Sequence, residues 1–187
     1  MTTYISILRG INVSGHRIIK MEVLREMFEQ LKFKNVKSYI QSGNIIFKFK
    51  NTEPNKLSAK ISDSINETFG LDVPVIVLEI KDVERIIKSN PFSKETEIDP
   101  AHLHVTFLSD IPDNNHVKKL SEIDFKKDKF YHKDNAVYLY CPDKYSNSKL
   151  TNGFIENKLK VTATTRNWKT VNELLKIAQN IEDKKIL

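Results

Sequence analysis

Hydrophobic and polar positions follow two periods in the first half of the chain, and the pattern predicts both strands and helices. Short apolar runs rich in β-forming residues predict strands over residues 3–9, 36–40, 44–49 and 73–80. Spacings of three and four predict helices over residues 21–31 and 57–69, the second ending at Gly70. The order strand, helix, strand, strand, helix, strand is the split β-α-β arrangement called ferredoxin-like.

The second half repeats this pattern after residues 89–101, a stretch with two prolines and no periodicity. Strands are predicted over residues 102–108, 125–132, 136–141 and 161–164. Helices are predicted around residues 117–120, 150–159 and 171–181, and Thr170 with Glu173 forms a capping box before the last one. We therefore predict an α+β protein of two ferredoxin-like (split β-α-β) units with antiparallel sheets, related as a distant internal duplication.

Composition agrees with two folded parts. The chain has 187 residues, of which 40% are hydrophobic and 29% charged, so wholesale disorder and a fibrous structure are excluded. This length lets two small domains each bury a core. We predict a ferredoxin-like domain over residues 1–90, a linker over residues 91–101, and a second α+β domain over residues 102–187 that ends in a helix.

The expected compartment is the cytoplasm. No apolar run approaches the roughly 20 residues of a transmembrane helix, so no membrane partner is expected. The amino end lacks the basic stretch and apolar block of a secretory signal. Cys141 is the one cysteine, so no internal disulfide can form, as is typical of a reducing compartment.

Net charge is +6, from 30 basic and 24 acidic residues, which raises the question of a nucleic-acid partner. The basic residues are mostly lysines interleaved with acids, and this arrangement favours a mixed solvated surface over a phosphate track. Only five are arginines: Arg9, Arg17, Arg25, Arg85 and Arg166. These rarer residues are the more informative ones.

Ferredoxin-like topology predicts a first candidate site. The third strand lies antiparallel between the first and second, so the ends of strands one and two and the start of strand three share one sheet edge. The residues expected there are Arg9, Gly10, Asn12, Gln41, Ser42, Gly43 and Asn44. Glycines let backbone N–H groups approach a ligand, and the planar guanidinium of Arg9 suits carboxylate or phosphate. Alternatively, these are turn residues, with Arg9 paired to a nearby acid.

A second candidate site runs from a predicted strand into the last helix. Its residues are Thr165, Arg166, Asn167 and Trp168. Free N–H donors at a helix N-terminus bind anions readily, and Arg166 and the threonine hydroxyl would add further donors. The alternative is a capping segment in which Trp168 packs between the two domains.

Other chemistry is weakly signalled. His102 and His104 lie on one face of a strand, but no further ligand completes a metal set. The common cofactor-binding and catalytic motifs are missing, so no metal or cofactor is expected and no catalytic residue is assigned. Cys141 fits a small apolar residue better than a nucleophile.

Three strings stand in order along the chain: LRGIN at residues 8–12 with Gly15 after it, YIQSGNIIF at residues 39–47, and ATTRNWKTV at residues 163–171. Together with Asn90-Pro-Phe, the 102–108 strand and Ser148-Lys-Leu, they closely resemble a bacterial family, domain-of-unknown-function family 1697. The resemblance spans nearly the whole chain. It implies a two-part α+β protein with ferredoxin-like units, and no established activity, substrate or cofactor.

Three function classes follow. The leading hypothesis is binding of a small anionic or polar metabolite at the LRGIN and IQSGN loops. If that site is catalytic, its residues suit stabilisation of a negative centre more than acid–base work. The second is nucleic-acid binding, since ferredoxin-like sheets can stack bases on aromatics; Phe47 and Phe49 share one strand face, although core packing explains them equally well. The third is a protein-interaction or regulatory module.

Overall fold

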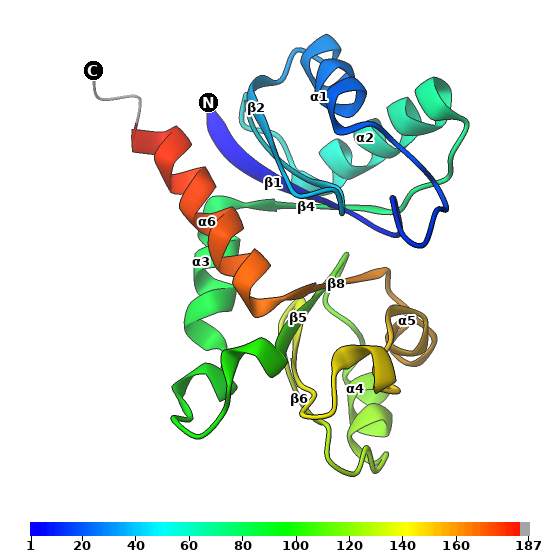
Figure 1. The fold of residues 1–187 in the computed structure, drawn as a ribbon, viewed down its shortest axis with the longest axis vertical. Helices are drawn as coiled ribbons and strands as arrows, with labels where there is room; N and C mark the ends of the chain where they lie inside the picture. Colours follow the sequence, from blue (N-terminus) through cyan, green and yellow to red (C-terminus); the bar gives the residue numbers. More distant parts are fainter. Residues whose placement is uncertain (184–187) are drawn as a thin grey trace. The chain divides into compact units, whose positions relative to one another are not determined.

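Two four-stranded antiparallel sheets form the framework of the protein (Figure 1). The structure, a computed structural model, describes residues 1–183. These residues divide into two compact units: unit 1 contains residues 1–84 and 173–183, and unit 2 contains residues 85–172. Both units carry helices and strands in the predicted order, so the predicted α+β class with two ferredoxin-like units is confirmed.

Unit 1 is a complete split β-α-β arrangement. Its elements are β1 (Thr2–Leu8), α1 (Met21–Gln30), β2 (Lys34–Tyr39), β3 (Asn44–Phe49), α2 (Pro54–Phe69) and β4 (Val75–Glu79). The strands lie in the order β2-β3-β1-β4, and every neighbouring pair is antiparallel. The predicted pairing of the first and third strands is therefore confirmed.

One face of this sheet packs on α1 and α2, which lie together above it in Figure 1. An aromatic cluster fills the centre of the core: the ring of Phe47 stacks on Phe33, with centroids 4.2 Å apart, and meets Phe28 edge to face at 5.6 Å. Burying each such side chain stabilises the fold by about 1.5–3 kcal/mol. The apolar stripes predicted for both helices supply the opposite wall, with Leu24 and Ile61 fully buried.

The other face of sheet 1 is also buried, although β3 places a lysine on it. Lys48 is only 5% exposed, and its ammonium donates a hydrogen bond of 2.7 Å to the carbonyl of Ile181 in α6 (Trp168–Asp183). The Thr3 hydroxyl on the same face donates to Glu182. Because a buried ammonium without a partner is costly, these contacts fix the last turns of α6 on unit 1.

Unit 2 repeats the arrangement of unit 1. Its elements are β5 (Leu103–Leu108), α4 (Asn114–Ser121), β6 (Lys129–Lys133), β7 (Ala136–Tyr140), α5 (Asn152–Leu159) and β8 (Ala163–Asn167). The strand order β6-β7-β5-β8 matches that of sheet 1 position by position, and all pairs are antiparallel. The 3₁₀ helices are η1 (Phe92–Lys94), η2 (Pro100–His102) and η3 (Tyr145–Asn147).

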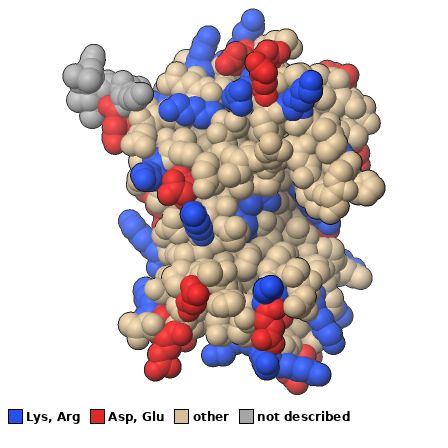
Figure 2. Space-filling model, in the orientation of Figure 1, with Lys and Arg blue, Asp and Glu red and all other residues tan. Residues whose placement is uncertain are grey.

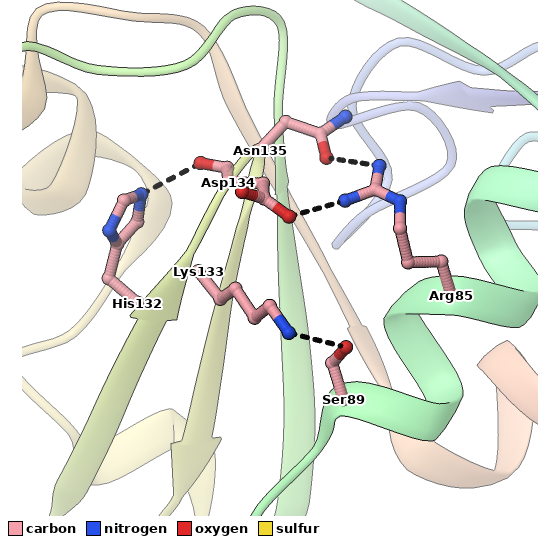
Figure 3. Close-up of polar contacts among 6 residues, drawn as sticks. All are labelled: Arg85, Ser89, His132, Lys133, Asp134 and Asn135. Atoms are coloured by element: carbon pink, nitrogen blue, oxygen red, sulfur yellow. Dashed lines mark hydrogen bonds and ion pairs between the residues drawn. The ribbon is translucent and has the colours of Figure 1, made fainter.

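Polar contacts fasten α3 (Ile80–Ser89) to the β6–β7 turn of unit 2 (Figure 3). The guanidinium of Arg85 forms an ion pair of 2.6 Å with Asp134 and donates a longer bond of 3.4 Å to Asn135. The ammonium of Lys133 donates to the hydroxyl of Ser89 at 3.3 Å. The second half of α3 is thereby held by residues that follow it by about fifty positions.

Some predicted bounds are wrong for local reasons. The strand predicted over residues 125–132 begins only at Lys129, because Lys126 has a left-handed backbone with φ of 59°. Helix α6 follows β8 directly and is capped by the side chain of Asn167, which accepts the Thr170 N–H at 2.8 Å. The predicted capping box at Thr170 and Glu173 is therefore one turn too late.

The boundaries of the compact units fall inside α3 and α6. Independent folding of residues 1–90 and 102–187 stays a prediction, and residues 184–187 of the second segment lie outside the described residues.

Candidate functional site

The first candidate site lies where β1 ends against the turn between β2 and β3. Ile7 pairs with Asn44 across the two central strands, and the backbone N–H of Leu8 donates to the Gly43 carbonyl at 2.8 Å. The backbone N–H of Arg9 turns to the other side and donates to the Pro74 carbonyl at 3.0 Å. Unit 1 therefore brings the LRGIN and IQSGN loops together at one sheet edge.

Gly43 serves packing at this edge. The residue is buried with φ of 77°, and a Cβ atom added to it would lie 2.7 Å from Leu8 Cβ and 2.9 Å from Ile11 Cδ1. Protein atoms thus occupy the space beside Gly43 into which we expected a ligand to reach. Gly10 differs, because a Cβ there would meet only the Arg17 guanidinium at an ordinary 3.7 Å, so its φ of 68° is what favours glycine.

Asn12 joins the two loops through its side chain. Its Oδ1 accepts the Ile19 N–H at 2.8 Å, and its Nδ2 donates to the carbonyls of Ile19 at 3.0 Å and Gln41 at 2.8 Å. Asn12 itself has a left-handed φ of 55°, a conformation that asparagine tolerates better than most residues. The amide is therefore engaged in holding residues 9–20 against the turn.

Asn44 and Ser42 close the turn from within. The buried Nδ2 of Asn44 donates to the Ser42 hydroxyl at 2.9 Å and to the Tyr39 carbonyl at 3.2 Å. Ile40, next to Tyr39, has φ of 50° and is 51% exposed. A positive φ is strained for a β-branched residue, so the surrounding bonds must hold the turn in place.

A cavity of about 400 Å³ lies beside these loops. Asn12 and Gln41 line it, and the remaining wall comes from the segment that starts α1: Ile18, Ile19, Lys20, Met21 and Glu22. Lys20 is the N-cap residue of α1, and its side chain makes no capping bond. The first-turn N–H groups of α1 consequently have no side-chain cap, and Lys20 and Glu22 bring opposite charges to the same wall.

In the second candidate site, strand β8 of unit 2 uses most of its polar groups internally. The Thr165 hydroxyl donates to Asn152 Oδ1 at 2.6 Å and lies 2.7 Å from the hydroxyl of Thr106. The guanidinium of Arg166 donates to its own neighbour, the Thr165 carbonyl, at 2.9 Å. Burial lowers the pKa of Arg166 to about 10, which still leaves the side chain charged at neutral pH.

Trp168 lines a cavity of about 420 Å³ in unit 2, together with Pro100, Ala101, His104, Asn167 and Lys169. The ring of His104 stacks on Tyr145 with centroids 4.8 Å apart, and its buried Nδ1 has no hydrogen-bond partner among residues 1–183. Burial lowers the pKa of His104, so the imidazole is neutral at neutral pH. His104 was noted in the sequence only for its spacing from His102, whose Nδ1 lies 3.1 Å from the Cys141 carbonyl.

The sequence reasoning missed the lysines that line cavities. Lys20 lines the unit 1 cavity with Asn12 and Gln41, and Lys169 lines the cavity that contains Trp168. Four more lysines line a third cavity, in unit 2, formed by residues 124–149. The available signal was the lysine-rich string at residues 126–129, which resembles an ordinary solvated surface. On the face shown in Figure 2, Lys and Arg side chains are indeed mixed with Asp and Glu.

Two classes of chemistry receive no support from the described residues. Residues 1–183 contain no group of three or more His, Cys, Asp or Glu side chains that could hold a metal ion. Burial raises the pKa of Cys141 to about 11, which keeps the thiol protonated at neutral pH.

Among residues 1–183, every helix is too short or too polar to span a bilayer.

These features define an α+β protein built from two ferredoxin-like units, each with cavities bordered by loop residues. The chain belongs to the family described as protein of unknown function (DUF1697), whose model matches residues 1–138. A solved structure of a conserved bacterial protein from Streptococcus pneumoniae has the same fold, with a TM-score of 0.75 and 22% sequence identity over 95% of this chain and 98% of that one. Comparison with curated proteins finds no match.

Proposed function

We propose that the protein binds a small anionic or polar ligand in the cavity of unit 1 beside the LRGIN and IQSGN loops. The observation that carries this proposal is the lining of that cavity: Gln41, Lys20 and the first turn of α1, which has no side-chain cap, border the same space of about 400 Å³. A cavity of this size suits a small metabolite.

Five of the predicted loop residues have a part in this proposal, while Arg9 and Gly10 do not line the cavity. Gln41 and Lys20 contact the ligand, Lys20 as a cation and Gln41 as a neutral donor and acceptor. Asn12, Ser42, Gly43 and Asn44 hold the two loops in register through the bonds and close packing described above. Glu22, also in the wall, favours a ligand that carries hydroxyl or amino donors besides its negative charge.

The second predicted cluster contributes a separate subsite in unit 2. Asn167 and Trp168 line its cavity with His104 and Lys169, while Thr165 and Arg166 support strand β8 from within. The neutral His104 ring and the Trp168 indole suit a ligand with a planar or apolar part, and Lys169 suits a negative group on the same ligand. The chain contains one tryptophan, so its fluorescence reports on this cavity alone.

Nucleic-acid binding ranks below ligand binding because the central strands of unit 1 lack a stacking platform. Tyr4 and Phe47 are fully buried among α1 and α2. The opposite face of β1 and β3 carries only aliphatic, hydroxyl, amide and ammonium side chains: Thr3, Ile5, Ile7, Asn44, Ile46 and Lys48. Single-stranded RNA is usually held on exposed aromatics of such strands.

A thermal-unfolding screen tests the proposal with inorganic phosphate, pyrophosphate, citrate and glutamate as probes. A ligand at a hundredfold excess over its Kd adds about 2.7 kcal/mol to the free energy of unfolding, which a melting curve resolves. Lys20→Gln and Gln41→Ala should each lose the shift, whereas Lys37→Gln on the exposed edge of β2 should keep it. No shift with any probe, or an equal shift in parent and both variants, would refute the unit 1 site.

Tryptophan fluorescence tests the subsite in unit 2 with the same four probes. A saturable change should appear for the parent and disappear in Lys169→Met, while Lys176→Met, further along α6, should leave it intact. Absence of any saturable change would remove the subsite and leave the unit 1 site to be judged by the melting screen.

A further inference from the structure

The third cavity lies in unit 2 and stands apart from both proposed sites. Its volume is about 410 Å³, within the range of small-molecule sites. Two loops form it, one before β6 and one after β7, and Lys129 pairs with Tyr140 where the loops begin. Its lining residues are Asp124, Phe125, Lys126, Lys127, Asp128, Asp143, Lys144, Asn147 and Lys149.

The three carboxylates in this lining already have partners. Asp128 accepts a hydrogen bond of 2.6 Å from the buried hydroxyl of Ser148, and Asp124 accepts the backbone N–H of Lys126 at 2.8 Å. Asp143 forms an ion pair of 3.1 Å with Lys127. Asp124 and Asp128 therefore help to hold the loops through neutral donors, and Asp143 is the carboxylate that is paired with a lysine of the lining.

The other three lysines of the lining have no such partner. Lys126, Lys144 and Lys149 form no ion pair with any of residues 1–183. With four lysines and three aspartates, the lining keeps a net charge of +1, which a compact anion would balance. Lysine serves phosphate as a mobile point charge with three donors.

Phe125 gives the cavity a rigid aromatic wall. Its ring is held edge to face by Phe130, at 5.6 Å between centroids, and by Phe154, at 5.7 Å. A planar group can pack on such a fixed ring, as aromatic rings do with one another. Acidic side chains between the lysines would repel an extended polyanion but can accept bonds from ligand hydroxyl groups.

The backbone of Lys144 adds a further constraint. Its φ of 83° and ψ of 140° form a combination that a residue with a side chain rarely adopts. Glycine would adopt this conformation freely, so a lysine at position 144 costs backbone strain that a glycine would avoid.

We propose that this pocket binds a mononucleotide, with the phosphate among Lys126, Lys144 and Lys149 and the base against Phe125. The ribose hydroxyls lie toward the carboxylates of Asp128 and Asp143, which can accept further bonds. This proposal stands independently of the two sites proposed above, because it uses neither their residues nor their cavities.

Titration calorimetry with AMP as the probe tests the proposal on the full chain. AMP should bind more tightly than inorganic phosphate or adenosine, since only AMP satisfies both walls. Lys149→Gln and Lys144→Gly should each weaken AMP binding by about tenfold or more, as expected for a lost hydrogen bond to a charged group. The matched control Lys118→Gln, on α4, should stay within about twofold of the parent.

Lys144→Gly separates binding from folding, because glycine relieves the backbone at this position. Its melting temperature should equal or exceed that of the parent while its AMP affinity falls. The proposal is wrong if AMP does not bind at millimolar concentration, or if both variants bind AMP like the parent. Inorganic phosphate binding as tightly as AMP, or a single-stranded oligonucleotide binding more tightly than AMP at these lysines, would also overturn it.

Discussion

At the scale of single residues, close packing explains why residue 43 is a glycine, although its loop borders the cavity of unit 1. Its missing side chain lets Leu8 and Ile11 close over the β2–β3 turn, and its positive φ suits the bend. The same sequence string therefore contains residues that build the site and residues, such as Gln41, that can face a ligand.

Gly43→Ala should destabilise unit 1 strongly. The new methyl group meets Leu8 Cβ, which is fixed to the backbone, at 2.7 Å and the buried Ile11 Cδ1 at 2.9 Å. Strain and a left-handed alanine together should lower the free energy of unfolding by about 2–4 kcal/mol. Urea denaturation measures this change. Gly70→Ala, with φ of 66° and open space around it, should lose only about 1–2 kcal/mol. Equal losses in the two variants would show that packing at Gly43 is unimportant.

His104 makes the stability of unit 2 depend on pH. Burial holds its folded-state pKa below the ordinary value of 6.5, so the unfolded chain takes up a proton at higher pH than the folded chain. Its contribution to stability is therefore fully present above pH 6.5 and is lost as the pH falls below that value. The neighbouring groups are the Tyr145 ring and His102.

The measurement is the free energy of unfolding between pH 8 and pH 5, compared for the parent and His104→Gln. The parent should lose more stability than the variant over this interval, because only the parent carries the buried imidazole. His132→Gln is the matched control and should follow the parent. Parallel curves for parent and His104→Gln would contradict the prediction.

At the scale of elements, charged and polar side chains of the β6–β7 turn contact the second half of α3. The contacts of Arg85 with the β6–β7 turn involve side chains that are about 40% exposed. Solvent weakens such an ion pair, although its short distance and the second bond to Asn135 favour it.

A double-mutant cycle of Arg85→Ala and Asp134→Ala should give a coupling energy of about 0.5–1 kcal/mol that decreases with added salt. The cycle isolates this pair from other contacts of Arg85. The more exposed pair of Lys127 and Asp143 serves as a comparison and should give a smaller coupling. A coupling of zero, or one that salt does not change, would mean that the geometry in Figure 3 contributes nothing electrostatic.

At the scale of the whole molecule, the chain returns to unit 1 after completing unit 2. The compact unit 1 includes residues 173–183 of α6, which the predicted domain over residues 1–90 lacks. The contacts of Ile181 with Lys48 and of Glu182 with Thr3 are lost in a chain that stops at residue 90.

A fragment of residues 1–90 should therefore keep much of its secondary structure but bind the hydrophobic dye ANS. The face of sheet 1 with Ile5, Ile7 and Ile46 would lack the final turns of α6, and Lys48 would lose its buried partner. Circular dichroism and ANS fluorescence, compared with the full chain, measure the two effects. A fragment that unfolds cooperatively without ANS binding would instead support residues 1–90 as an independent domain.

The local sequence pattern alone determined the element order and the α+β class, because hydrophobic periodicity reports each helix and strand from neighbouring residues. The pairing of β1 with β3 followed from that order, since ferredoxin-like connectivity places these two strands side by side in one sheet. This connectivity also determined that the LRGIN and IQSGN loops meet. The tertiary structure decided which of their groups are engaged within the protein. Asn12 bonds to the Gln41 carbonyl of the other loop, and Asn44 bonds to the Tyr39 carbonyl of its own turn. Leu8 and Ile11 fill the space beside Gly43. The tertiary structure decided equally that α6 starts at Trp168 with Asn167 as its cap, and that lysines scattered over residues 126–149 border one cavity. Such outcomes depend on distances between segments far apart in the chain, which no local spacing encodes.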